Sequence, residues 1–514
     1  MERLRLWLIE ENRLVGCVPQ LSAINHQLCR MLASSKHSDF ADWLSPMLVK
    51  ELRQGMRSRV FVAAFYLTQL LMILSTVFSL IAASRTDNVP SDLFGFLSGL
   101  FWFMVSVPLL FVMPLLGFGA LHTEMKAGTL ELVFLTRLSA WRIVAGKWTA
   151  LMAETLLLVC AILPYVILRY FLGGVDIIED LQSLFFLLLA SALLTATTLA
   201  MSPYESKLLR ALFIIGLIFA FQFLIGILFT WMAFARTGVS SGSAPPTWQI
   251  YLILLAFVPA FVVMALEIAA SRIAPPVENH AVRKRLIGLY LLLVAPVLVL
   301  ILGNANGIYG ISLLFLVVVV VDALAEPQET LRAVYRPFLR MGRAGRLLSL
   351  FFTPGWASAS WYVLLLVGLG GVMLFFQGGL NDAEQMLEYV SYLGSLVFPA
   401  ALIRLFIPNT RFFLPFYIGL QFLFAAVTFL VGMISGISSE PMTAWLCPIP
   451  TCVFLLNTIE QVKSGQVTEF LAVTGLVTAA SLGILLARTI TPLRKTGWWT
   501  NGGARVRDFN MATK

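Results

Sequence analysis

The segment FVAAFYLTQLLMILSTVFSLIAAS, residues 61–84, contains no charged side chain and decides the fold class. A helix needs about 20 apolar residues to cross the hydrocarbon core of a bilayer, and this segment is longer than that. A transmembrane strand would alternate polar and apolar residues, which this segment does not do. The segment therefore predicts a membrane-spanning α-helix.

The rest of the chain repeats this pattern. Of its 514 residues, 59% are hydrophobic and 12% are charged, and the mean hydropathy is +0.87. A fold in water would have too few polar residues to cover its surface, so the expected fold is an all-α polytopic transmembrane bundle. We expect about 12 spans, near residues 60–84, 95–120, 148–171, 181–202, 210–235, 248–271, 286–303, 308–325, 356–378, 388–407, 412–436 and 468–488.

The distribution of basic residues predicts the orientation of these spans. With the N-terminus in the cytoplasm, all of the 36 Lys and Arg except Arg85, Arg169, Arg236 and Lys463 fall on the cytoplasmic side, as the positive-inside rule requires. Both termini are then cytoplasmic in a multi-pass protein of the cell membrane, with a bacterial inner membrane as the expected location. Residues 441–459 are also apolar and form either a re-entrant or external helical piece or a thirteenth span.

The spans are expected to form two parallel six-helix halves. PYESKLLRALFIIGLIFAFQFLIG in the first half and PNTRFFLPFYIGLQFLFAAVTFLVG in the second both contain Ile-Gly-Leu and Gln-Phe-Leu. The predicted organisation has four parts: an N-terminal cytoplasmic segment with an amphipathic helix (1–59), a first half (60–272) with a cytoplasmic stretch at 123–147, a divergent second half (273–490), and a basic cytoplasmic tail (491–514).

The segment SPMLVKELRQGMRSRVF, residues 45–61, has the pattern of an amphipathic helix. Leu48 and Leu52 share one helical face, which favours a helix lying at the headgroup surface before the first span. An anchoring helix without a partner fits this pattern equally well. The positive charge comes from Lys50, Arg53, Arg57 and Arg59.

The segment TEMKAGTLELVFLTRLSAWRIVAGKW, residues 123–148, is too polar for the membrane, but its apolar residues recur at helical spacing. Gly128 and Thr129 predict a helix start, with Thr129 as the cap and Glu131 in the first turn. Ser139 is the expected cap of a second helix that starts at residue 140 or 141. Either a separate protein covers the apolar face, or the segment packs on the chain's own spans.

These two segments resemble those of the type-2 ABC transporter permeases. That family has a Pro-x-Leu run followed by Lys-Glu-Leu-Arg before span one, and Glu-x-x-x-Gly-Thr-Leu-Glu between spans two and three. The matching residues here are Pro46, Leu48, Lys50, Glu51, Leu52 and Arg53, and then Glu124, Gly128, Thr129, Leu130 and Glu131. A Leu-Thr-Pro-Leu-Ser run that follows in the family is present as residues 135–139, with Arg137 in place of the proline.

The resemblance covers about 45 residues and implies roles for both segments. It implies that the first is a connecting helix along the membrane, formed by Pro46, Lys50, Glu51, Arg53 and Arg57. It implies that the second is a coupling helix that docks into a separate cytoplasmic ABC ATPase, two copies of which are expected. The coupling residues would be Glu124, Gly128, Thr129, Leu130, Glu131, Thr136, Leu138 and Ser139. The chain would then be the permease subunit of an exporter.

The sequence contains no nucleotide-binding motif of its own. Gly-x-x-x-x-Gly-Lys followed by Ser or Thr does not occur, and GRAGRLLS lacks the phosphate-binding lysine. ATP and Mg²⁺ are therefore expected on the partner, with no cofactor, catalytic residue or metal site in this chain and no nucleic-acid partner. The four histidines, His26, His37, His122 and His280, are not at a metal-binding spacing.

The loop after the eighth predicted span, residues 326–355, carries a degraded echo of the coupling motif in Glu326, Thr330 and Leu331, with five arginines added. It either contacts a second ATPase copy poorly or binds anionic lipid headgroups, and we favour the lipid interpretation.

Ionisable residues inside spans are costly and need partners or water. Glu154, Glu267 and Asp322 lie in predicted spans, each near its cytoplasmic end. Snorkelling or a pair such as Glu267 with Arg272 is favoured over a substrate role. Two other functions stay open: a non-transporting scaffold of an ATPase-driven secretion or motility assembly and, less favoured, a membrane enzyme acting on lipid-linked substrate.

Overall fold

A computed structural model describes residues 46–85, 91–128, 138–172, 176–204, 209–218, 221–222, 225–226, 247–275, 278–302, 305–328, 334, 337–338, 340–377, 383–406, 413–437 and 467–495. Within these ranges all regular structure is helical, which confirms the predicted all-α class. The helices are α2 (Pro46–Met56), α3 (Arg59–Arg85), α4 (Ser91–Val107), η1 (Pro108–Val112), α5 (Met113–Ala120), α6 (His122–Lys126), α8 (Ala140–Leu172), α9 (Ile177–Met201), α11 (Thr247–Ile273), α12 (Ala281–Leu302), α13 (Ala305–Ala325), α15 (Gly342–Phe352), α16 (Trp356–Gln377), α17 (Ala383–Phe406), α18 (Phe413–Ile437) and α21 (Val467–Lys495).

Eight helices in the described part of the chain are long and apolar enough to cross a membrane: Arg59–Ile81, Phe96–Lys126, Ala140–Phe171, Ile177–Met201, Trp248–Ile273, Ala281–Leu302, Tyr389–Phe406 and Ala472–Ile490. They coincide with predicted spans one to four, six, seven, ten and twelve, so the multi-pass membrane character is supported. Shorter apolar helices lie in the other four predicted spans: Leu209–Ile218, Phe315–Ala325, Trp356–Val372 and Phe413–Val427. The total of 12 spans stays a prediction, and residues 441–459 lie outside the described ranges.

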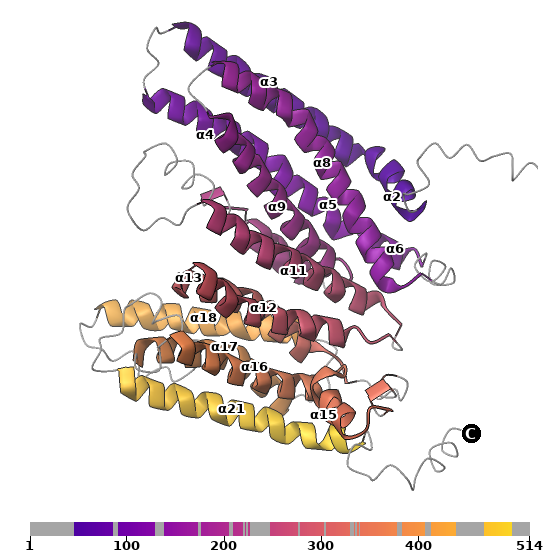
Figure 1. The fold of residues 1–514 in the computed structure, drawn as a ribbon, viewed down its shortest axis with the longest axis vertical. Helices are drawn as coiled ribbons and strands as arrows, with labels where there is room; N and C mark the ends of the chain where they lie inside the picture. The colour runs from indigo at the N-terminus through magenta and orange to yellow at the C-terminus, as the bar shows by residue number, and fades with distance from the viewer. Residues whose placement is uncertain are drawn as a thin grey trace, which may run out of the picture.

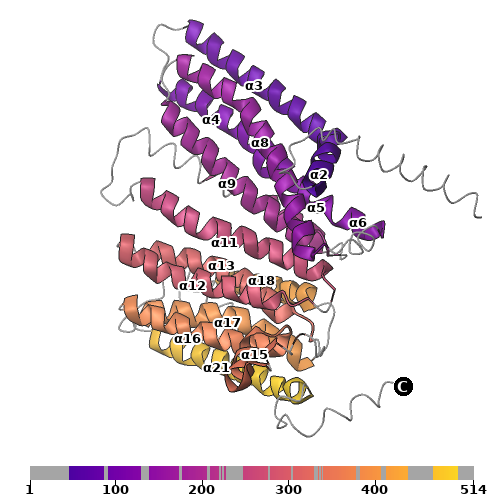
Figure 2. The same cartoon turned by 45° about the vertical axis from the view of Figure 1, so that its right-hand side comes forward.

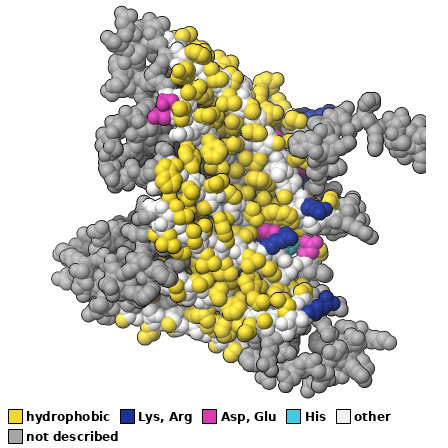
Figure 3. All heavy atoms as spheres, in the orientation of Figure 1, with side chains coloured by type: hydrophobic (Ala, Val, Ile, Leu, Met, Phe, Trp, Pro, Cys, Tyr) yellow, Lys and Arg dark blue, Asp and Glu magenta, His cyan; other side chains and the backbone are white. Residues whose placement is uncertain are grey.

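The long helices lie side by side, with α3 and α8 at one edge of the molecule and α21 at the other (Figure 1). In both ribbon views, α2, α6, the α11–α12 connection and α15 lie at the same end of these helices (Figure 2). The broad face between the two ends is hydrophobic, and Lys and Arg side chains gather along the edge where these four elements lie (Figure 3). We call this edge the basic end.

The buried apolar residues form two main clusters. One joins α3, α4, η1, α5, α8 and α9. The other also includes residues of α8 and α9, and it extends through α11, α12, α13, α16, α17 and α18 to α21. Small residues such as Ala196 and Ala200 on α9, and Ala265 and Ala269 on α11, are buried where these helices adjoin, which lets helices approach closely in a membrane. Helix α11 was assigned to the first half by sequence, and it packs against both α9 and α12.

The second span contains a local change of helical geometry. The backbone N–H of Met113 donates to the carbonyl of Pro108, five residues earlier, which makes η1 a π-helical turn between α4 and α5. Pro108 has no backbone N–H, so the α-helical hydrogen-bond pattern is interrupted at this point. The turn lies between a helix that contacts α3 and a helix that contacts α9.

Candidate functional site

The segment after the second span begins as the short helix α6. Gly128 has a φ of +67°, a conformation that favours glycine, and its N–H donates to the carbonyl of Met125 at 3.2 Å. Gly128 therefore follows the C-terminal end of α6, where the sequence predicted the start of a helix. Thr123, Lys126 and Gly128 are exposed. The predicted coupling residues Thr129, Leu130, Glu131 and Thr136 lie outside the described residues.

The helix predicted after Ser139 begins at Ala140 and runs into the third span as α8. The carbonyl of Ser139 accepts hydrogen bonds from the N–H groups of Arg142 at 3.0 Å and Ile143 at 3.3 Å. Leu138 and Ser139 are half-buried, and Ala140 is fully buried. The predicted start of this helix is confirmed.

A buried lysine connects the two segments that carry the family resemblance. The Nζ of Lys147 on α8 lies 3.0 Å from Glu51 Oε2 on α2 and 2.7 Å from Glu124 Oε1 on α6. The lysine side chain is only 4% exposed, whereas those of Glu51 and Glu124 are 13% and 23% exposed. We call these three residues the Lys147 cluster. It holds Glu124 in an internal ion pair, although the resemblance implied that Glu124 helps to couple the chain to an ATPase.

Helix α2 forms where it was predicted, and its two sides differ. Leu48 and Leu52 are half-buried, while Lys50, Arg53 and Arg57 are exposed. Gly55 lies against Glu154 of α8, since a Cβ at position 55 would collide with Glu154 Oε1. Glu154 is buried and borders this connecting helix at the basic end. This position is consistent with the predicted location of Glu154 near the cytoplasmic end of its span.

Further contacts fix the start of α6, and the sequence did not single out the residues that make them. Ser202, after α9, accepts hydrogen bonds through its hydroxyl from the N–H groups of Leu121 at 3.0 Å and His122 at 3.1 Å. The guanidinium of Arg210 donates to the Tyr204 carbonyl at 2.6 and 2.8 Å and also contacts His122 Nδ1. A Ser or an Arg in a connection between helices carries no sequence signal for such tertiary contacts.

A second charged cluster lies between α11, α12 and α13. Lys284 Nζ on α12 lies 2.6 Å from Asp322 Oδ2 and 2.5 Å from Glu326 Oε1, and all three side chains are less than 10% exposed. Arg272 Nη2 on α11 lies 3.0 Å from Asp322 Oδ1, and Arg285 Nη2 lies 3.0 Å from Glu326 Oε2. We call these five residues the junction cluster. It gives Asp322 the partners that its predicted position in a span requires.

The junction cluster also anchors the chain around α15 and α16. The guanidinium of Arg285 donates to the Phe351 carbonyl at 2.6 Å and to the Ser358 hydroxyl at 3.0 Å. Glu326 Oε2 accepts the N–H of Gly355 at 3.2 Å. Burial raises the pKa of Glu326, but the positive charges of Lys284 and Arg285 hold it below its usual value. Glu326, the first residue of the degraded coupling motif, is therefore held in ion pairs inside the protein, and Thr330 and Leu331 lie outside the described residues.

Glu267 does not pair with Arg272, which corrects the sequence prediction. Its Oε2 lies 2.7 Å from His280 Nδ1, and its Oε1 lies 3.1 Å from Arg283 Nη1. Residues 267 and 272 are five apart on one helix, about 140° around the axis, so their side chains diverge. The prediction that Glu267 has a basic partner is confirmed, with a different partner.

His280 lies between two carboxylates. Its Nδ1 faces Glu267, and its Nε2 lies 3.1 Å from Glu278 Oε2. Ionised carboxylates only accept hydrogen bonds, so both ring nitrogens must donate, as they do in the charged imidazolium. Burial lowers the pKa of His280, but the hydrogen bonds and charges of Glu267 and Glu278 raise it above its usual value.

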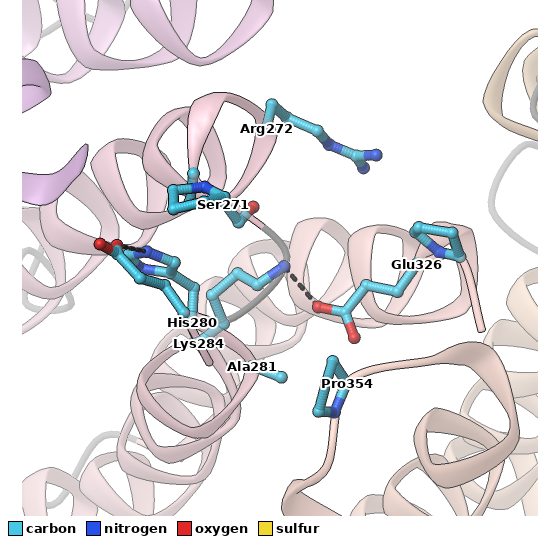
Figure 4. Close-up of a pocket in the computed structure, with 11 residues that line it drawn as sticks. Ser271, Arg272, His280, Ala281, Lys284, Glu326 and Pro354 are labelled. Carbon is cyan, nitrogen blue, oxygen red and sulfur yellow. Dashed lines mark hydrogen bonds and ion pairs between the residues drawn. The ribbon is translucent and has the colours of Figure 1, made fainter. Parts of the chain in front are cut away.

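A pocket of about 260 Å³ opens between these groups at the basic end (Figure 4). Its wall includes Arg272, His280, Lys284 and Glu326, and a dashed line in Figure 4 marks the ion pair between Lys284 and Glu326. Within the wall, His280 pairs with Glu278 and Lys284 pairs with Glu326, and Arg272 pairs with Asp322, which does not line the pocket. The arrangement is suited to holding helices together rather than to general acid–base catalysis.

An ion pair at the opposite end accounts for one exception to the charge rule. Arg169 Nη1 near the end of α8 lies 3.5 Å from Asp180 Oδ2 in the first turn of α9, and its guanidinium lies 4.7 Å from the centre of the Phe101 ring. It also contacts the Ser98 hydroxyl. Asp180, which precedes the predicted span 181–202 by one residue, is a buried residue of α9. Arg169 is thus neutralised within the protein.

Comparisons of the chain with protein-family models, curated proteins and solved structures find no match.

Proposed function

We propose that this chain is the membrane-spanning permease subunit of an ABC transporter, with about 12 spans in two parallel halves and both termini in the cytoplasm. A separate ABC ATPase, in two copies, would dock on the basic end and supply ATP hydrolysis. Movement at the docking surface would tilt the two halves and move an unidentified substrate, with export as the favoured direction. This function rests on the resemblance of residues 46–53 and 124–139 and on their arrangement in space.

The observation that supports the proposal best is the Lys147 cluster. It joins the predicted connecting helix to the predicted coupling segment although they are far apart in the sequence. It leaves Thr123, Lys126 and Gly128 exposed at the basic end, where a soluble partner can reach them. A force applied to α6 would pass through Lys147 to α2 and to the start of α8.

Co-purification tests the docking surface. The chain is co-expressed with the ABC ATPase subunits of its host, and the amount of ATPase retained on the purified chain is measured. Glu131→Arg should abolish retention while membrane insertion is unchanged, because the substitution reverses a charge within the proposed coupling segment. The matched control is Glu179→Arg at the opposite end of α9, which should retain the ATPase. Equal retention by the Glu131→Arg variant and the unmodified chain would refute the proposal.

A transport assay separates export from the scaffold alternative. The chain and its ATPase are reconstituted in vesicles, and ATP-dependent flux of labelled candidate substrates is measured. Flux that disappears in the Glu131→Arg variant supports a transporter. Retention of the ATPase without flux of any candidate favours a scaffold that uses ATPase binding for mechanical work.

A further inference from the structure

Glu154 in α8 is a buried carboxylate that has no basic partner in the described part of the chain. The residue is 3% exposed, and it forms no hydrogen bond or ion pair with a described residue. By contrast, Glu267, Asp322 and Glu326 each lie 2.5–2.7 Å from a Lys or His nitrogen. An ionised carboxylate that is buried without a partner is strongly destabilising. Glu154 is therefore accommodated in a different way from the other buried acids at the basic end.

The end of α2 lies directly against the carboxyl group of Glu154. A Cβ on Gly55 would collide with Glu154 Oε1 and would lie 3.3 Å from Oε2, so the absence of a side chain at Gly55 permits this approach. Gly55 belongs to the last turn of α2, which ends at Met56. The last turn of a helix presents carbonyl oxygens that are not bonded within the helix, and it carries the negative end of the helix dipole. These groups repel a carboxylate, but they can accept a hydrogen bond from a protonated carboxyl group.

The Lys147 cluster does not supply the missing positive charge. Glu51 precedes Gly55 by one helical turn, so it lies on the side of α2 that faces α8. Lys147 contacts both Glu51 and Glu124, and one lysine shared by two carboxylates leaves a net negative charge. Ionisation of Glu154 would add a second negative charge beside this cluster.

Within the described ranges, the other helices packed against α8 bring no compensating cation to Glu154. Helix α5 has no charged residue, and the acidic residues of α9 lie in its first turn at the opposite end. At the start of α3, Arg59 is exposed. On α11, Glu267 and Arg272 are held in the ion pairs described above. The charged side chain that acts on Glu154 is Glu51, and it has the same sign.

We propose that Glu154 is a proton-binding site, that it is a neutral carboxylic acid when α2 packs on α8, and that release of its proton loosens this contact. The carboxyl O–H would donate to a carbonyl oxygen in the last turn of α2. On release, the proton passes to water at the basic end, and the new negative charge is repelled by Glu51 and by the end of α2. The connecting helix would then separate from α8 as the pH rises. This device does not depend on whether an ATPase docks at the basic end.

Hydrogen exchange of the full-length chain in detergent at pH 6 and pH 8.5 tests the proposal, after correction for the intrinsic effect of pH on exchange. Exchange of the α2 amides should be about tenfold faster at pH 8.5, which is a change of about 1.4 kcal/mol in the free energy of local opening. Glu154→Gln keeps the shape of the neutral acid, so it should abolish this difference and keep α2 protected at both values. Infrared spectroscopy at pH 6 should show a protonated carboxyl band that is missing from Glu154→Gln.

Two further variants separate a proton site from a structural contact. Glu51→Gln removes the neighbouring negative charge, so the loosening of α2 should begin at a lower pH. Glu278→Gln removes an exposed carboxylate at the basic end outside this contact, and it should leave the pH dependence of α2 unchanged. Circular dichroism and size-exclusion chromatography check that each variant keeps its helices and remains monodisperse.

Three results would overturn the proposal. One is equal pH dependence of α2 exchange in the unmodified chain and Glu154→Gln, and another is α2 exchange that does not change with pH in the unmodified chain. The third is protection of α2 that depends on the concentration of Na⁺ or K⁺ at constant pH, because Glu154 would then hold a metal cation in place of a proton.

Discussion

Two lysines at the basic end use the same chemistry in different surroundings. Lys147 and Lys284 are both 4% exposed, and each contacts two carboxylates within 3.0 Å. The carboxylates around Lys147 belong to α2 and α6, whereas both partners of Lys284 lie at the end of α13. The partners of Lys147 are 13% and 23% exposed, and those of Lys284 are 6% and 9% exposed.

Because of this difference in burial, the two clusters have different structural roles: the Lys147 cluster connects peripheral helices to a span, and the junction cluster anchors spans to one another. The Lys147 cluster ties short peripheral helices to a span, and water can reach its carboxylates when those helices move. The junction cluster is backed by Arg272 and Arg285 and by backbone groups near α16, so opening it would expose several charges to an apolar interior. The comparison predicts that the same substitution has unequal consequences at the two lysines.

The largest effect is expected for Lys284→Met. It leaves Asp322 and Glu326 with one basic partner each, and removal of one member of a buried ionic network costs about 3–5 kcal/mol of folding stability. Thermal and chemical denaturation of the detergent-purified chain measures this loss. The control is Lys50→Met, which changes an exposed lysine and should alter stability by less than about 1 kcal/mol. Similar losses in the two variants would contradict the assignment of Lys284 as an anchor.

A smaller and more local effect is expected for Lys147→Met, about 1–2 kcal/mol, because Glu51 and Glu124 can turn toward water. Hydrogen exchange should rise in α2 and α6 and stay unchanged in α12 and α13. The same measurement on Lys284→Met should give the reverse pattern. Faster exchange throughout both variants would show that the two clusters form a single cooperative unit, and the distinction between them would be lost.

A third effect concerns pH. Because the pKa of His280 is raised in the folded protein, its imidazolium contributes stability that is complete below the unfolded value near 6.5. This contribution is lost as the pH rises through the folded value, so stability should fall by on the order of 1 kcal/mol above pH 6.5. The groups that face or surround His280 are Glu267 and Arg283, Glu278, and, across the pocket, Arg272, Lys284 and Glu326.

Melting temperatures at pH 6 and pH 8.5 measure this dependence. The His280→Gln variant should have a flatter profile and should already be less stable at pH 6. Arg283→Gln is the matched control, because it removes a partner of Glu267 that does not titrate in this range. A parallel pH profile for the unmodified chain and His280→Gln would assign the dependence to another group.

The smallest effect is expected for Gly128→Ala, below about 1 kcal/mol, because α6 is short and exposed and its end can rearrange. An added Cβ would meet no atom within 4 Å at Gly128 or at Gly119, but only Gly128 has a positive φ. Gly119→Ala is therefore a matched control for backbone conformation. Retention of the ATPase should decrease for Gly128→Ala and not for Gly119→Ala. Equal retention of the ATPase by the two variants would show that the backbone conformation at the end of α6 does not affect ATPase binding.

The sequence predicted the helices well and their charged contacts poorly. The first predicted span, 60–84, corresponds to the helix Arg59–Arg85, and the predicted span 356–378 corresponds to the helix Trp356–Gln377. Both predictions succeeded because a local run of apolar residues specifies such a helix. The pairing of Arg272 with Asp322 joins residues 50 positions apart, and no local pattern specifies it. The sequence also did not single out Lys147 as a centre of contacts, since the positive-inside rule already explains a lysine at the predicted cytoplasmic start of a span.

The π-helical turn at η1 lets one span serve two neighbours. One extra residue per turn shifts every later side chain by about 100° around the axis relative to an uninterrupted α-helix. Side chains that would have continued along the face of α4 next to α3 are thereby reoriented in α5, which contacts α9. A single-residue deletion between Pro108 and Val112 would restore the phase of the helix, and the half of the span nearest the basic end would present the wrong surface to α9.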